Sequence, residues 1–124
     1  FEIFLPAISV GLLSTAVLNL NNLRDREEDI KNDKNTLVVK LGTEKAKKYH
    51  YFLIITALVS TIIYVFLDFT SVYQLVFLVA FIPLLKNIKT VAHNKVPAEL
   101  DTELKKVALS TFLFAILLGI GHIF

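Results

Sequence analysis

Cysteine, methionine and tryptophan are absent from this sequence of 124 residues, and charged residues make up only 19%. The absence of cysteine excludes a disulfide framework and a cysteine-bound zinc site. Average soluble domains carry about 25% charged residues, whereas hydrophobic residues make up 55% of this chain. So much apolar surface excludes disorder, and a net charge of +2 is too small to predict nucleic-acid binding. Because the chain begins at Phe1 inside an apolar run and has no methionine, we expect a piece of a longer protein.

Charge is missing altogether from four long stretches, residues 3–23, 49–67, 69–85 and 107–124. Each is close to the roughly 20 residues that an α-helix needs to cross a bilayer core. A soluble helix would carry a polar face, and a chain this short cannot bury four wholly apolar helices from water. The sequence therefore predicts an all-α, multi-pass transmembrane helical bundle whose four spans lie in a lipid bilayer.

All 13 lysine and arginine residues lie in two segments between these stretches, residues 24–48 and 86–106. Four spans in series place both segments on the same side of the membrane. Loops rich in Lys and Arg remain in the cytoplasm under the positive-inside rule. We therefore expect a protein of the inner (cytoplasmic) membrane with both basic loops on the cytoplasmic side.

The first basic loop also carries a regular series of acidic residues. Asp25, Asp29 and Asp33 are four apart, so on a helix they share one face and repel one another. Mg²⁺ would reverse that repulsion, because it prefers oxygen ligands and takes one or two protein carboxylates plus substrate phosphate oxygens. Asn21 lies one turn before Asp25, and Arg24 and Lys34 are placed to neutralise a diphosphate. A solvated helix extension held by pairs such as Glu27–Lys31 is the simpler alternative for the other charges.

Three segments carry a resemblance to a known family. Residues 21–29 read NNLRDREED, residues 34–42 read KNTLVVKLG, and residues 94–101 read NKVPAELD. The first two resemble the second aspartate-rich motif of the UbiA superfamily of membrane prenyltransferases, and all three resemble its 1,4-dihydroxy-2-naphthoate branch. At the position before Lys34, where that branch usually has glycine, this chain has Asp33.

The resemblance implies a fold, a reaction and a site. The fold is a bundle of nine helices in which residues 1–124 form the C-terminal half. The first motif, of the type N-D-x-x-D, is not in this sequence, so the chain alone should be inactive. The reaction moves a polyprenyl group from its diphosphate to 1,4-dihydroxy-2-naphthoate and gives demethylmenaquinone. Asp25 and Asp29 would hold Mg²⁺ with help from Asn21, and Arg24 and Lys34 would bind the diphosphate.

Other functions stay open at this point. A relative of the same family could act on another acceptor, such as 4-hydroxybenzoate. A four-span transport or channel subunit would need polar residues within its spans, and these spans hold few. A structural membrane subunit would leave the spacing of the aspartates unexplained.

Two further expectations concern local structure. Gly119 and Gly121 in the last span predict a close approach between helices. The stretch 37–41 has a composition typical of a strand, but we expect a loop that returns to the second span, since an open sheet edge is excluded from lipid.

Overall fold

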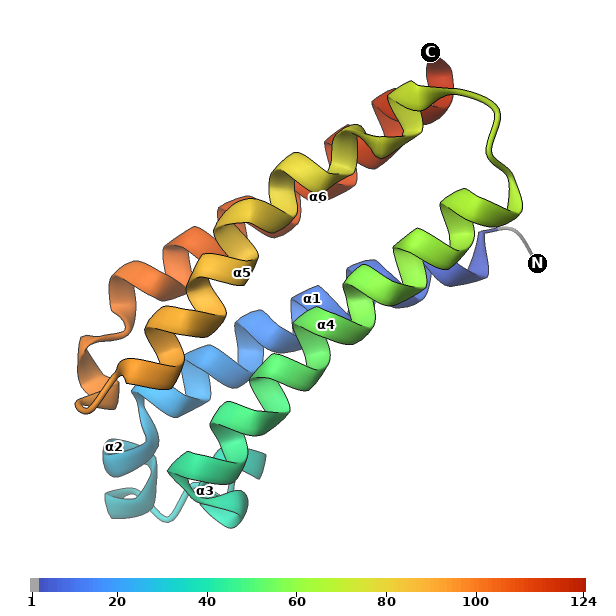
Figure 1. Ribbon diagram of the computed structural model, residues 1–124. Coiled ribbons are helices and arrows are strands. Elements are labelled where there is room, and N and C mark those ends of the chain that lie inside the picture. Colours follow the sequence, from blue (N-terminus) through green and yellow to red (C-terminus); the bar gives the residue numbers. More distant parts are fainter. Residues whose placement is uncertain (1–2) are drawn as a thin grey trace.

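The computed structural model describes residues 3–124, and within that part of the chain every regular element is a helix (Figure 1). The fold class predicted from the sequence is confirmed. The long helices are α1 (Phe4–Arg24), α4 (Thr43–Leu67), α5 (Leu78–His93) and α6 (Asp101–Ile123). The short ones are α2 (Arg26–Lys31), α3 (Leu37–Leu41) and the 3₁₀ helices η1 (Val72–Phe77) and η2 (Pro97–Glu99).

The four long helices form two pairs, α1 with α4 and α5 with α6, and α6 also packs against α1 (Figure 1). The short helices α2, α3 and η2 gather at one end of the bundle, and the turn from α4 to η1 lies at the other. We call the first of these the charged end, since residues 24–48 and 86–106 carry every lysine and arginine.

Within residues 3–124, four helices are long and apolar enough to cross a membrane. They are Phe4–Arg24, Thr43–Leu67, the continuous η1–α5 segment Val72–His93, and Asp101–Ile123. The chain is a multi-pass membrane protein. All four extend past the charge-free stretches into the charged end, α1 by a single residue, because charged residues such as lysine, arginine and glutamate are good helix formers where a helix continues into water. The exact limits of the membrane-embedded parts stay a prediction.

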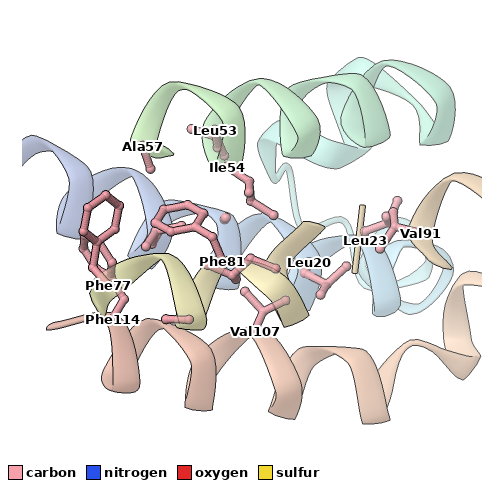
Figure 2. Close-up of a cluster of buried hydrophobic side chains, with 14 of the residues drawn as sticks. Leu20, Leu23, Leu53, Ile54, Ala57, Phe77, Phe81, Val91, Val107 and Phe114 are labelled. Carbon is pink, nitrogen blue, oxygen red and sulfur yellow. The ribbon is translucent and has the colours of Figure 1, made fainter. Parts of the chain in front are cut away.

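Aromatic and branched side chains fill the space between the two helix pairs (Figure 2). Phe77, Phe81 and Phe114 meet edge to face, with ring centroids 5.4 to 6.1 Å apart. Such pairs stabilise a core beyond their buried area. This cluster joins η1, α5 and α6 into one packed unit.

Hydroxyl and amide groups link α1 to α4. The Ser9 hydroxyl lies 3.1 Å from the carbonyl oxygen of Ala57 and accepts a bond from the Thr61 hydroxyl at 2.9 Å. The Asn19 amide donates to the carbonyl of Ala46 at 3.0 Å. In membranes such bonds add to van der Waals packing, because the hydrophobic effect does not drive helices together in lipid.

The stretch 37–41 is a helix of one turn, so the prediction of an irregular loop was wrong there. Thr36 caps its start by accepting a hydrogen bond from the Val39 amide at 3.2 Å. Gly42 ends it with a φ of 85°, a conformation that glycine adopts without strain. A threonine before the segment and a glycine after it are capping signals that the strand-like composition obscured.

Of the two glycines expected to allow close packing, Gly121 does and Gly119 does not. A β-carbon at Gly121 would lie 2.6 Å from the carbonyl oxygen of Tyr73. A β-carbon at Gly119 would meet nothing within 4 Å. The absence of a side chain at Gly121 therefore sets how closely α6 approaches η1.

Gly121→Ala is expected to lower the free energy of unfolding by about 1–3 kcal/mol, the usual cost of overpacking. The obstacle is backbone, which cannot rotate away as a side chain would. Thermal unfolding of the detergent-solubilised protein measures the effect. Gly119→Ala on the same helix is the matched control and should be neutral or slightly stabilising. Equal melting temperatures for the two variants would contradict the close contact.

Candidate functional site

Arg24 lies at the centre of the charged end, on the last turn of α1. Its Nε donates to Asp25 at 2.8 Å, its Nη2 to the Asn21 side-chain oxygen at 2.9 Å and its Nη1 to Asp101 at 2.7 Å. Asp101 is the first residue of α6. The guanidinium therefore binds two of the three predicted metal ligands and joins α1 to α6.

The Arg24 guanidinium lowers the pKa of the Asp25 carboxyl below its ordinary value, mainly by donating hydrogen bonds to the ionised form. Partial burial opposes this shift, and the positive charge of Lys34 adds to it. Asp25 is thus an anion at neutral pH. Because its pKa is lower in the folded chain, the stabilisation is present above the unfolded-state pKa and is lost as pH falls through the folded-state pKa.

Asp29 lies one turn further along, on the buried side of α2. Its backbone N–H donates to the Asp25 carbonyl at 2.9 Å, and the residue is only 8% exposed. One carboxylate oxygen lies 3.9 Å from the Lys34 ammonium. The other, Oδ2, is buried and has no hydrogen-bond partner within residues 3–124. A buried oxygen without a partner is costly, and a cation is one group that would satisfy it.

Asp33 does not continue the face of Asp25 and Asp29, so the expected stripe of three aspartates on one helix was wrong. The helix α2 ends at Lys31. The Lys34 N–H donates to the Asp29 carbonyl at 2.8 Å and the Asp33 N–H to the Ile30 carbonyl at 3.3 Å. This is a Schellman motif with Asp33 in the left-handed position, at φ 54°. Glycine is usual at that position because it adopts a positive φ without strain. Aspartate can replace it because it tolerates a positive φ better than most residues.

A cleft of about 520 Å³ opens beside Asp25. We call it the acidic cleft; its lining residues are Arg24, Asp25, Glu27, Glu28, Lys31, Ala98 and Asp101. Asp29 and Lys34 are not among them. Within residues 3–124 no three His, Asp or Glu side chains converge as a metal site. The described chain therefore offers two separate carboxylates, each with a basic partner, which suits a cation that takes one or two carboxylates and completes its shell elsewhere.

The two basic segments touch each other through two pairs of residues that are far apart in the sequence. The Lys47 ammonium donates to the Asn94 carbonyl at 2.6 Å, and Arg24 binds Asp101. These bonds hold one end of the segment 94–101 against the start of α4 and the other against the aspartate-rich segment. The sequence predicted residues 21–29 and 94–101 as separate motifs, but it did not predict that the two segments are in contact.

A buried chain of polar groups, which sequence reasoning missed, links α4, α5 and α6. His50 Nε2 lies 2.7 Å from the Asn87 side-chain oxygen. The Asn87 amide donates to Glu103 at 2.9 Å, and Lys106 donates to the other Glu103 oxygen at 3.0 Å. Asn87 lies in phase with the buried Ala80 and Leu84 on α5, and that phase is the signal that could have revealed it.

Four apolar helices with a charged site at one end define a polytopic membrane protein. The model of the UbiA prenyltransferase family matches residues 1–101. The chain belongs to the UbiA prenyltransferase family, as the resemblance of its motifs implied.

Three relatives share the name 1,4-dihydroxy-2-naphthoate octaprenyltransferase. Those of Escherichia coli and Haemophilus influenzae are 37% and 39% identical over 96% and 97% of this chain. That of Mycobacterium leprae is 31% identical over 89% of it. The chain spans 39% of the length of the first two and 36% of the third. No solved structure matches the chain.

Proposed function

We propose that this chain is the C-terminal part of a membrane prenyltransferase that moves a polyprenyl group from its diphosphate to 1,4-dihydroxy-2-naphthoate. Diphosphate and the ring carboxylate, as CO₂, are released, and the product is the quinol form of demethylmenaquinone. The observation that carries the acceptor is the agreement of the three relatives, whose shared name specifies this naphthoate. The motif at residues 94–101, which resembles the same branch, agrees with it. Because the relatives are more than twice as long, the activity is proposed for the full-length protein.

The residues at the charged end suit the binding of a diphosphate with Mg²⁺. We assign Asp25 and Asp29 to the metal, with Asn21 assisting. Mg²⁺, when bound, neutralises the charge that develops on the diphosphate as it leaves. The Arg24 guanidinium donates hydrogen bonds to the side-chain oxygens of Asn21 and Asp25. These bonds hold the two oxygens in place and keep the guanidinium beside the position proposed for the diphosphate. Lys34, with its ammonium 3.9 Å from Asp29, adds a second positive charge on the other side of the turn.

The orientation in the membrane follows from the same charges. Every lysine and arginine lies at the charged end of the bundle, so we infer that this end faces the cytoplasm. Both substrates would then reach the site from the cytoplasmic side of the inner membrane. The isoprenoid tail would lie along apolar helix faces.

The test uses membranes that contain the full-length protein. They are given a labelled polyprenyl diphosphate and either 1,4-dihydroxy-2-naphthoate or 4-hydroxybenzoate, in Mg²⁺ or in EDTA. We expect a prenylated naphthoquinol that forms only with Mg²⁺. A product with hydroxybenzoate alone would keep the family and refute the naphthoate, and the absence of any product would refute the proposed activity.

A further inference from the structure

A second cleft, of about 260 Å³, lies beside the acidic cleft and shares Arg24, Glu27 and Ala98 with it. It opens where the beginnings of α2 and α4 meet the loop between α5 and α6. We call it the basic cleft; its lining residues are Arg24, Arg26, Glu27, Thr43, Lys95, Val96, Pro97 and Ala98. The function proposed above leaves Arg26 and Lys95 without a role.

The two clefts differ in the sign of their charge. Three of the side chains that line the basic cleft are cationic, and Glu27 is the single acid among them. The acidic cleft has two cations, Arg24 and Lys31, against four carboxylates. An anion without a metal would be repelled by the acidic cleft and attracted by the basic one.

Arg26 is incompletely satisfied by the described chain. Its Nε is buried and has no hydrogen-bond partner within residues 3–124. Over the same residues neither Arg26 nor Lys95 forms an ion pair. A buried guanidinium N–H without an acceptor is costly, and carboxylate and phosphate oxygens are the acceptors that a guanidinium fork fits.

The loop that carries Lys95 is held firmly. Asn94 accepts the bond from Lys47, and Asp101 binds Arg24, so the segment between them is fixed at both ends. Pro97 begins the short helix η2 in its middle. The backbone at Lys95, which lines the basic cleft, is thus held by the fold, so less backbone entropy is lost when its ammonium binds an anion.

We propose that the basic cleft binds the carboxylate of the aromatic acceptor. This inference rests on the proposed function, and it holds for either acceptor, since naphthoate and hydroxybenzoate both carry a carboxylate. The volume is below the roughly 300–1,000 Å³ of ordinary ligand pockets, which suits one end of a small molecule rather than a lipid. A diphosphate brings Mg²⁺ with it and suits the acidic cleft; the acceptor brings none.

The test measures how Arg26→Gln and Lys95→Gln change the kinetics of the full-length protein in membranes. Each variant should raise KM for the acceptor about tenfold or more, equivalent to about 1.4 kcal/mol or more of binding free energy. KM for the polyprenyl diphosphate at saturating Mg²⁺ should stay unchanged. Lys48→Gln is the matched control, because Lys48 is an exposed lysine at the same end that lines neither cleft.

A second measurement separates a carboxylate contact from a general disturbance of the loop. Inhibition by 1,4-dihydroxynaphthalene, which lacks the carboxylate, should be equally strong for the unaltered protein and for both variants. If KM for the diphosphate rises instead, or if neither KM changes, the inference is wrong while the proposed function stands. If the unaltered protein transfers no prenyl group to either acceptor, the proposed function fails and the inference fails with it.

Discussion

Asp29→Asn in the full-length protein is expected to lower kcat/KM for prenyl transfer at least about 100-fold, the usual effect of losing one group that stabilises charge in the transition state. The substitution keeps the shape of the side chain and removes its negative charge. Asp29 has a buried oxygen without a partner, so the amide also replaces a cation ligand with a group that fits poorly there. Asp25→Asn should have a similar effect, since it removes the second carboxylate.

The control for this prediction is Glu44→Gln, which removes an exposed carboxylate from the first turn of α4 at the same end of the bundle. It should retain full activity. The folded state of each variant is checked by its thermal unfolding in detergent, where Asp25→Asn should cost little because the Arg24–Asp25 pair is partly exposed. A double variant of Asp25 and Asp29 that kept full activity would refute the metal assignment.

Much of this architecture could be predicted from the sequence because a bilayer leaves few choices. A charge-free stretch in lipid must satisfy its own backbone hydrogen bonds, so it becomes a helix. The four stretches accordingly became four helices, with differences only at their ends. At those ends water can satisfy the backbone, and local capping decides the structure. This is why Thr36 and Gly42 produced a helix where we expected a loop.

The site could be predicted only in part, for a different reason. Asn21, Arg24 and Asp25 are neighbours in the sequence, and the structure brings them together. The bond from Arg24 to Asp101 joins residues 77 positions apart in the sequence, and it depends on how α1 packs against α6. Spacing along one helix says nothing about such packing.

The predicted face of three aspartates failed at Asp33 for a local reason. A helical repeat of four continues only while the backbone remains in the right-handed region. The Schellman bonds from Asp33 and Lys34 end α2 after Lys31. The family's usual glycine at position 33 already indicated the end of a helix. The four-residue spacing of aspartates therefore predicts a shared face only for Asp25 and Asp29, which precede that turn.

Asn87→Leu is the substitution expected to cost most in stability, about 2–6 kcal/mol, because it leaves two buried polar partners short of a hydrogen bond at about 1–3 kcal/mol each. Asn87 is 2% exposed and bonds both His50 and Glu103. Leucine has a similar volume but bonds neither, so His50 loses its acceptor and the buried Glu103 loses a donor. Thermal unfolding of the detergent-solubilised protein should show a large fall in melting temperature.

Two comparisons test whether that fall comes from the buried polar chain. Thr90→Leu adds a leucine at an exposed position of the same helix and should change the melting temperature little. Adding Glu103→Leu to Asn87→Leu should cost much less than Glu103→Leu costs alone, because removing both partners of a buried bond leaves fewer polar groups unsatisfied than removing one. If the two substitutions are strictly additive, Asn87 and Glu103 act independently, and their hydrogen bond contributes nothing to holding α5 against α6.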